Sequence, residues 1–355
     1  MSLFQKIVNI CLDKNLNFVV FSYPGKQDFQ LVIENPDSDL RTDSEFIFHP
    51  FKVSKATPEI RIQSHFCFNS SELNDHNLEE IQTLKSAPKI EISEEIEEIS
   101  KDQYVNDLGK GIKNMGTAGL DKFIFSRITT HIKSNNLDLS NYLISLRKNH
   151  KKTFTYLLQH QSSGIWMGAT PETLLSWKNQ MISTMSLAGT QKSDLNVLPL
   201  WTQKEIEEHE YVTQYIERTF ADLKIPIITK ARETVHAGPV VHLRTLISSK
   251  GQVDFKSALQ CANALHPTPA VCGLPLEKAQ QYISEIESYD RTYYTGYLGW
   301  IHADKELELF VNLRCMQIHP KKLALYVGGG ITSKSDVEKE WEETMLKAQT
   351  LLNVL

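Results

Sequence analysis

The stretch Leu323–Lys347, LALYVGGGITSKSDVEKEWEETMLK, combines three signals that decide how this chain folds. The apolar run Leu323–Val327 is typical of a buried strand, and the three glycines at 328–330 are expected to break it. Ser335, with Glu338 three residues later, forms a capping box that predicts the start of a helix. The stretch therefore predicts a strand, a glycine turn and a helix, an arrangement that builds binding sites.

The predicted helix carries an acidic face. Glu340, Glu343 and Lys347 lie on one face because they recur at offsets of three and four residues. That face adjoins an apolar seam made of Trp341, Met345, Ala348, Leu352 and Leu355. The carboxylates are therefore expected to border the core. The alternative is an ordinary solvated face with a Glu343–Lys347 pair worth about 0.3–0.5 kcal/mol.

A second predicted helix, 201–223, has a core stripe that turns acidic. Glu205 and Glu208 continue the apolar stripe of Val212, Ile216, Phe220 and Leu223 toward the N-terminus. Burying several carboxylates is costly, so the pattern indicates a compensating cation. Oxygen ligands favour magnesium or calcium over zinc, and bound Mg²⁺ commonly takes further ligands from water and an anionic substrate. Alternatively, the two glutamates simply favour the positive end of their helix dipole.

Composition narrows the class of protein. The 355 residues are 41% hydrophobic and 23% charged, enough for one large domain or two. A net charge of −5 without a basic run makes nucleic acid and acidic membrane surfaces poor partners. The five scattered cysteines fit a reducing compartment. Residues 1–22 hold no signal-peptide core and no stretch is long enough to span a bilayer, so a soluble, cytoplasmic protein is expected.

The chain divides into an N-terminal part, 1–100, without chemical motifs and a site-bearing part, 101–355. The N-terminal part is predicted to mix helix with strands, among them 17–23 and 46–48. Its acidic end, Lys89–Asp102, has isoleucines at helical spacing, and Tyr104–Met115 is predicted to continue as helix.

Beyond this boundary, segments rich in β-branched and aromatic residues alternate with helices. Strands are predicted at 122–128, 153–158, 165–168, 174–177, 181–187, 237–246, 294–301, 307–318 and 323–327. Short connections, as at Lys178-Asn179 and Pro320-Lys321, imply antiparallel pairing and an α+β fold. No dinucleotide or Walker motif occurs in the sequence, so the triple glycine is weak evidence for a nucleotide site.

Three further residues could carry chemistry. Lys122 begins the strand KFIFSRI on the face of Ile124, where it could be desolvated. Glu172, in GATPETLL, is expected to open a helical turn, and the alternative is an ordinary first-turn carboxylate. Arg314, predicted on the same strand face as Phe310, is a natural fork for a substrate carboxylate, although a structural salt bridge is as common.

Nine runs resemble, in order, the motifs of the chorismate-utilising enzymes, a family that includes isochorismate, salicylate, anthranilate and aminodeoxychorismate synthases. The runs are DKFIFSR, GATPETLL, SLAGT, KEIEEHEYV, VVHLRT, LHPTPAVCGLP, YYTGYLGW, VNLRC and YVGGGITSKSDVEKEWEETMLKA. The resemblance covers roughly Lys101–Leu355. It implies a four-layer α+β fold, with two large, mainly antiparallel sheets packed together and helices outside. It also implies chorismate as the small-molecule substrate, no glutaminase subunit, and a monomer or weak dimer.

The resemblance also implies a role for each matching residue. Glu208 and Glu343 resemble direct Mg²⁺ ligands, and Glu205 and Glu340 resemble outer carboxylates that reach the ion through water. The metal would hold the ring carboxylate of chorismate. At Glu205 many relatives have aspartate, a difference that should change reach more than charge.

Other matching positions form the expected substrate pocket. Arg314 and Tyr294 resemble residues that bind the enolpyruvyl carboxylate. The further pocket positions are Gly328, Gly329, His242, Thr268, Ala188 and Lys347. Ala188 stands where aminodeoxychorismate synthases carry a nucleophilic lysine, so no covalent adduct is expected.

The resemblance implies water as the nucleophile, because Lys122 stands where water-using members carry their general base. Lys122 would take a proton from water attacking ring carbon 2, and Glu172 would protonate the departing hydroxyl on carbon 4. The run 266–271, HPTPAV, resembles isochorismate synthases more than salicylate synthases. We therefore predict an Mg²⁺-dependent isochorismate synthase. The alternatives are a salicylate synthase and an inactive chorismate-binding protein, and the product could feed menaquinone or siderophore synthesis.

Overall fold

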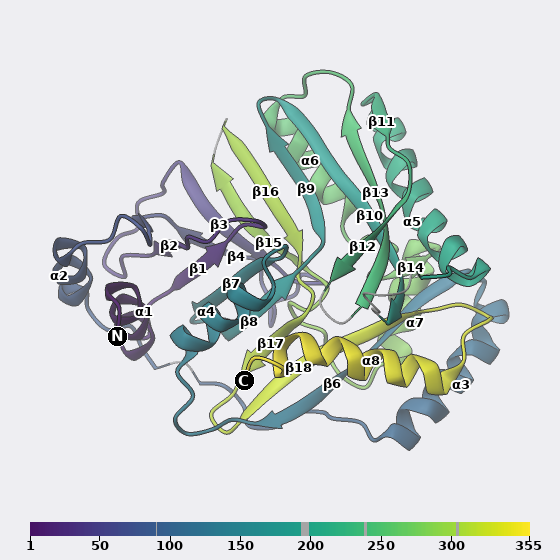
Figure 1. Cartoon of the computed structure of the whole chain (residues 1–355), viewed down its shortest axis with the longest axis horizontal. Helices are drawn as coiled ribbons and strands as arrows, with labels where there is room; N and C mark the ends of the chain where they lie inside the picture. The colour runs from purple at the N-terminus through teal and green to yellow at the C-terminus, as the bar shows by residue number, and fades with distance from the viewer. Residues whose placement is uncertain (90, 193–198, 238–239, 303–304) are drawn as a thin grey trace.

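The computed structural model describes residues 1–89, 91–192, 199–237, 240–302 and 305–355, and two sheets dominate it (Figure 1). All ladders between the named strands are antiparallel, as the short connections predict. The first sheet, sheet A, runs in the order β14 (Gly273–Leu274), β6 (Lys122–Ile132), β18 (Lys322–Ile331), β17 (Cys315–Ile318), β8 (Gly164–Thr170), β7 (Phe154–His160), β1 (Phe18–Ser22), β2 (Gln30–Ile33), β5 (Phe66–Asn69).

Sheet B runs in the order β11 (Ile227–Thr229), β13 (Val240–Ser249), β10 (Met181–Lys192), β9 (Thr173–Lys178), β16 (Glu306–Val311), β15 (Tyr297–His302), β3 (Ser44–His49), β4 (Ile60–Gln63), with β12 (Glu233–Ala237) also paired to β13. An aromatic core joins the two sheets. Phe154 of sheet A stacks on Phe310 of sheet B with ring centroids 4.2 Å apart, and Phe21 lies 5.2 Å from Phe46. The sheets therefore pack face to face.

Helices cover the outer face of each sheet. Sheet A is covered by α1 (Leu3–Asp13), α4 (Leu139–Asn149) and α8 (Val337–Leu352), with α2 (Asp75–Thr83) packed on α1. Sheet B is covered by α5 (Gln203–Asp222) and α6 (Phe255–Leu265). The remaining helices, α3 (Lys101–Ala118) and α7 (Leu276–Ile286), pack against the β6 edge of sheet A. The predicted four-layer α+β fold is confirmed.

The first hundred residues are woven into both sheets. They supply β1, β2 and β5 to sheet A, and β3 and β4 to sheet B. The helical spacing in 89–102 was misleading, because the described residues from 91 to 100 contain no helix and α3 begins only after its Ser100 cap. There the chain runs extended along β6, where Glu98 bridges to Ile128 and accepts a hydrogen bond from Thr130 N at 3.0 Å.

Two expectations for the deciding stretch are wrong in detail. The glycines do not break the strand, since Gly328, Gly329 and Gly330 pair with β6 and the strand ends only at Ile331. The helix cap is Asp336 rather than Ser335. The Asp336 side chain accepts from the N–H groups of Glu338 and Lys339, whereas the Ser335 hydroxyl accepts from Thr332 N.

The segment 307–318 was predicted as one strand and is two. β16 belongs to sheet B and β17 to sheet A, so residues 312–314 carry the chain from one sheet to the other. Arg314 lies at this crossing with a left-handed φ of 48°, and its carbonyl accepts from Ala169 N at 3.0 Å. Glu172 likewise opens no helix, because it lies between β8 and β9.

In the part of the chain that the structure describes, no helix is both long and apolar enough to cross a membrane. All five cysteines are free thiols, and only Cys67 is exposed.

Candidate active site

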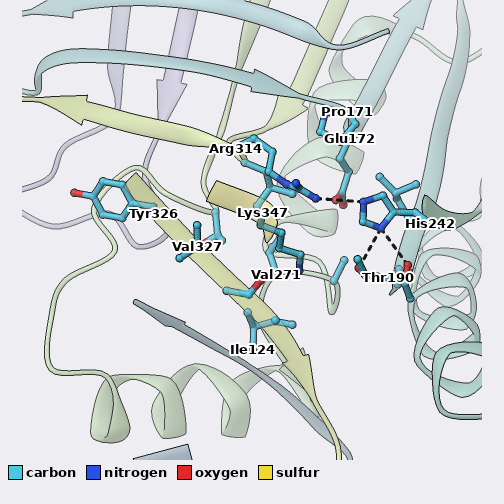
Figure 2. Close-up of a pocket in the computed structure, with 18 of the residues that line it drawn as sticks. Ile124, Pro171, Glu172, Thr190, His242, Val271, Arg314, Tyr326, Val327 and Lys347 are labelled. Carbon is cyan, nitrogen blue, oxygen red and sulfur yellow. Dashed lines mark hydrogen bonds between the residues drawn. The ribbon is translucent and has the colours of Figure 1, made fainter. Parts of the chain in front are cut away.

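A pocket forms where the two sheets, α5 and α8 meet (Figure 2). The predicted site residues that line it are Glu172, Ala188, Glu208, His242, Tyr294, Arg314, Gly328, Gly329 and Lys347. They come from eight separate stretches of the chain. Folding therefore collects most of the predicted substrate positions in one place.

Arg314 and His242 form the cationic part of the pocket. Arg314 Nη1 donates to Thr350 Oγ1 at 3.0 Å, and Arg314 Nη2 lies 3.3 Å from His242 Nε2. His242 Nδ1 lies 3.1 Å from the Gly189 carbonyl, which only accepts, so Nδ1 carries the proton and Nε2 accepts from Arg314. Burial, with Arg314 and Lys347 nearby, lowers the pKa of His242 to about 3, and the ring is neutral.

Arg314 is available to an anionic ligand. It is buried, and burial lowers its pKa to about 10, so it stays charged at neutral pH. Among the described residues it forms no ion pair within 4.0 Å. A buried guanidinium without a carboxylate partner suits a substrate carboxylate.

Glu172 points toward Arg314 and His242 (Figure 2). Its backbone is fixed on both sides, because Glu172 N donates to Thr170 Oγ1 at 3.3 Å and its carbonyl accepts from Val311 N at 3.0 Å. Burial raises its pKa to about 8, although Lys122, Lys347 and Arg314 act in the opposite direction. Glu172 is therefore mostly protonated at neutral pH and can donate a proton.

Lys122 is fully buried and lies against Glu208. Lys122 Nζ is 3.0 Å from Glu208 Oε1 and, within the described residues, makes no well-directed hydrogen bond. Burial would raise the pKa of Glu208, but Lys122, Lys204 and Lys347 lower it overall, so the carboxylate is ionised. Lys122 itself does not line the pocket, but its partner Glu208 does.

The two glutamates of α8 are also paired with lysines. Lys204 Nζ lies 2.5 Å from Glu340 Oε1, and Lys347 Nζ lies 2.7 Å from Glu343 Oε1. Lys347 also donates to the Gly328 carbonyl at 2.7 Å. The expectation that these carboxylates border the core is confirmed for Glu340, which is only 2% exposed, so the alternative of an ordinary solvated face does not hold there.

Two of the three glycines of β18, Gly329 and Gly330, make room for these carboxylates. A Cβ atom at Gly329 would lie 3.1 Å from Glu340 Oε2 and 3.4 Å from Glu343 Oε1. A Cβ atom at Gly330 would overlap Glu208 Oε1. The run is therefore glycine because acidic side chains from two helices approach the strand closely.

The donor set fits a hard divalent cation. Glu208, Glu340 and Glu343 converge on β18, and Glu340 Oε2 is buried without a hydrogen-bond partner among the described residues. The arrangement is held by lysines, however, and within the described ranges no three His, Cys, Asp or Glu side chains form a ready-made metal cluster. Glu205 turns back to its own helix start, where Thr202 N donates to Glu205 Oε2 at 2.9 Å.

The structure differs from the sequence-based prediction of the site at two positions, Thr268 and Lys204. Thr268 does not line the pocket, and its buried Oγ1 has no partner within the described residues. Lys204, which pairs with Glu340, was missed. Its position four residues before Glu208 on the same helix was a usable signal.

The comparisons with known proteins agree with this geometry. The profile of the chorismate binding enzyme family matches residues 42–355. The chain is 32% identical over 267 residues to the vibriobactin-specific isochorismate synthase of Vibrio cholerae, covering 71% of this chain and 66% of that protein. It is 30% identical over 247 residues to isochorismate synthase EntC of Escherichia coli, covering 67% of this chain and 63% of that protein.

Solved structures share the fold. A putative 2,3-dihydroxybenzoate-specific isochorismate synthase from Bacillus anthracis superposes with a TM-score of 0.77 at 22% identity, covering 98% of this chain and 99% of that one. The menaquinone-specific isochorismate synthase of Escherichia coli gives 0.77 at 19% identity, covering 100% and 91%. Anthranilate synthase component I from Streptococcus pneumoniae gives 0.69 at 16% identity, covering 94% and 92%.

The chain belongs to the chorismate binding enzyme family. The matches to the two curated relatives named above span 66% and 63% of those proteins' own length.

Proposed function

We propose that this chain is an isochorismate synthase, an isomerase that converts chorismate to isochorismate. The observation that carries the proposal is the pairing, at one pocket, of a protonated Glu172 with an Arg314 that has no carboxylate partner within the described residues. An acid and a carboxylate-binding fork are what loss of a hydroxyl from a carboxylated ring requires. The names of the relatives support the same activity.

In this mechanism Arg314 and Tyr294 bind the enolpyruvyl carboxylate and orient the ring. Lys122, on its flexible stem beside Glu208, takes a proton from the water that attacks carbon 2. Glu172 gives its proton to the hydroxyl that leaves carbon 4, and the ring double bonds shift. The oxygen gained at carbon 2 balances the one lost at carbon 4, so the reaction is an isomerisation.

We also propose Mg²⁺ as the cofactor, held directly by Glu208 and Glu343 and through water by Glu205 and Glu340. When bound, the ion would neutralise the ring carboxylate of the substrate. Glu340 Oε2, which is buried and has no hydrogen-bond partner among the described residues, and the glycine strand beside it support this assignment. Its binding requires the lysines that pair with these glutamates to move aside.

Three further properties complete the proposal. Ala188 lines the pocket where a lysine nucleophile would be needed for a covalent adduct, which supports direct attack by water. We expect a monomer or weak dimer that acts on chorismate without a glutaminase subunit. A cytoplasmic location remains a prediction from the free cysteines.

The test is the product that purified protein forms from chorismate and Mg²⁺, separated by chromatography. We expect isochorismate to accumulate, with the same mixture reached from either substrate and no nitrogen incorporated when ammonium is present. Salicylate and pyruvate as main products would favour a salicylate synthase. Chorismate binding without turnover would indicate an inactive binding protein.

A further inference from the structure

A buried ion pair lies outside the pocket but against its wall. Arg291 Nη2 and Nε lie 2.6 Å and 2.7 Å from the two carboxylate oxygens of Glu287, a bidentate contact, and the side chains are 2% and 1% exposed. Neither residue lines the pocket. The mechanism proposed above gives the pair no task.

The Arg291 guanidinium uses all five of its N–H groups. Besides the two bonds to Glu287, Nη1 donates to the Val271 carbonyl at 2.8 Å and to Thr295 Oγ1 at 3.3 Å, and Nη2 donates to the Ile124 carbonyl at 2.9 Å. Val271, Thr295 and Ile124 all line the pocket. One side chain therefore ties together three walls that are distant in sequence.

Glu287 anchors the same wall from its other side. Its Oε1 accepts from Ser126 N at 2.8 Å and from Ser126 Oγ at 2.7 Å. Ser126 pairs in register with Gly328, the strand residue whose carbonyl accepts from Lys347. The pair thus ties β6, which begins at Lys122 and is itself paired with the glycine strand, to the Val271 and Thr295 walls.

Arg291 contacts the turn that carries Tyr294 through its main chain and, at Thr295, through its side chain. Tyr294 N donates to the Arg291 carbonyl at 2.8 Å. Thr292 and Thr295 on either side adopt left-handed φ values of 49° and 61°, which are costly for β-branched residues and persist only where surrounding contacts impose them.

We propose that Glu287 and Arg291 are positioning residues that set the distance between the Lys122 strand, the Val271 loop and Tyr294, and so the binding of the substrate ring. The inference deepens the proposed function and rests on it. The pair acts through the pocket walls and does not touch the substrate. Because a misplacement of about 1 Å can cost on the order of 10²-fold in rate, a loosened wall should impair turnover without removing a catalytic group.

Three variants test this role. Arg291→Lys keeps the charge beside Glu287 but has three donors in place of a planar five-donor fork. The double variant Glu287→Leu/Arg291→Met removes both charges together, so no buried charge is left unpaired. Ser126→Ala is the mildest change, because it leaves the ion pair intact and removes one bond to Glu287 and one contact with the Tyr289 hydroxyl.

The matched control is Arg147→Lys. Arg147 is also buried and donates to backbone carbonyls, those of Lys26, His150, Lys151 and Thr153, none of which lines the pocket.

The first readout is amide hydrogen exchange, which does not depend on activity. We expect amides of 124–126 and Tyr294 to exchange at least about tenfold faster in Arg291→Lys and in the double variant, with β1 amides unchanged. Arg147→Lys should leave the 124–126 and Tyr294 amides as in the parent.

The second readout is steady-state turnover of chorismate. KM should rise about tenfold and kcat should fall in both Arg291 variants, less in Ser126→Ala, and not in Arg147→Lys. Folded variants with parental KM and parental exchange would overturn the positioning role, as would lost turnover without any change in exchange. A parent protein that does not turn over chorismate would overturn the proposed function, while the exchange comparison would still decide the role of the pair.

Discussion

Glu172 and Glu208 line the same pocket and are both buried, yet they take opposite protonation states. Burial disfavours the charge on each. Glu172 has no lysine within ion-pair distance among the described residues, and its pKa rises to about 8. Glu208 has Lys122 at 3.0 Å, and its pKa is lowered.

The difference shows that contact with lysine ammonium groups, first of all the 3.0 Å contact with Lys122, rather than burial alone, divides the pocket into an acid and a carboxylate cluster. In the proposed mechanism Glu172 gives a proton to the leaving hydroxyl, and the ionised Glu208 is the proposed cation ligand. Substitutions at Glu172, Lys122 and Glu208 should each change this difference in protonation.

The largest effect is expected for Glu172→Gln, which removes the proton donor and keeps the shape. We expect kcat to fall by about 10²- to 10⁴-fold. The matched control is Glu308→Gln, because Glu308 on β16 is another carboxylate whose pKa burial raises, and it lies in a different hollow. Its turnover should equal that of the parent.

The raised pKa of Glu172 predicts how turnover depends on pH. The protonated form of Glu172 is the active one, so kcat/KM should fall as the pH rises through about 8, where this carboxyl loses its proton. The charged groups near Glu172 are Lys122, Lys347 and Arg314, and each of them lowers the pKa of Glu172. Parental turnover in Glu172→Gln, with the alkaline limb intact, would show that another group is the acid.

Lys122→Gln should lower kcat by about 10²- to 10⁴-fold while chorismate still binds, because the lysine acts on water and not on the carboxylates. It should also make Glu208 resemble Glu172. Without Lys122, the largest of the contributions that lower its pKa, Glu208 would bind a proton more tightly in the folded variant than in the folded parent, so the variant should lose stability relative to the parent as pH rises through the range in which carboxylates titrate.

Thermal unfolding across this pH range would measure the effect, and Lys122→Gln/Glu208→Gln is its control because the double variant lacks the carboxylate. Turnover of Lys122→Gln at the parental rate would refute the base assignment.

Glu208→Gln should weaken Mg²⁺ binding at least about tenfold and remove Mg²⁺-dependent turnover, and Glu343→Gln should do the same. Calorimetric titration with Mg²⁺ would measure it. Glu207→Gln is the control, since Glu207 immediately precedes Glu208 on α5 and pairs with Lys334. Equal Mg²⁺ affinity in the Glu207 and Glu208 variants would remove Glu208 from the ligand set.

The sequence predicted the elements whose signal is local. The periodic stripe of α5 was visible with its acidic end, and the structure places Glu208 where that stripe meets the sheet. The break at Arg314 was invisible, because 307–318 keeps an alternating pattern while the chain passes from one sheet to the other. The alternation of apolar and polar residues indicates which side chains of a strand are buried, but it does not indicate which sheet the strand joins.

The resemblance to family motifs predicted more of the site residues than the local sequence patterns did. No local pattern pairs Lys122 with Glu208, which are 86 positions apart in the sequence and meet only when β6 and α5 pack. The cap illustrates a smaller failure. Ser335 and Asp336 are adjacent candidates of similar capping strength, and which one caps depends on the entry angle of the chain.

The smallest effect is expected for Glu205→Gln, and it separates a metal role from a structural one. In the structure Glu205 accepts from Thr202 N, so it closes the capping box at the start of α5. Glutamine can close the same box, so the melting temperature should stay near that of the parent.

A carboxylate that reaches the ion through water should nevertheless matter for affinity. We expect Mg²⁺ binding to weaken by about tenfold in Glu205→Gln, less than in Glu208→Gln. Glu205→Ala is the matched comparison, because it loses the cap as well and should melt at a lower temperature with a similar loss of affinity. If Glu205→Gln binds Mg²⁺ as tightly as the parent while Glu205→Ala only loses stability, Glu205 is a helix cap alone, and the carboxylate cluster is confined to Glu208, Glu340 and Glu343.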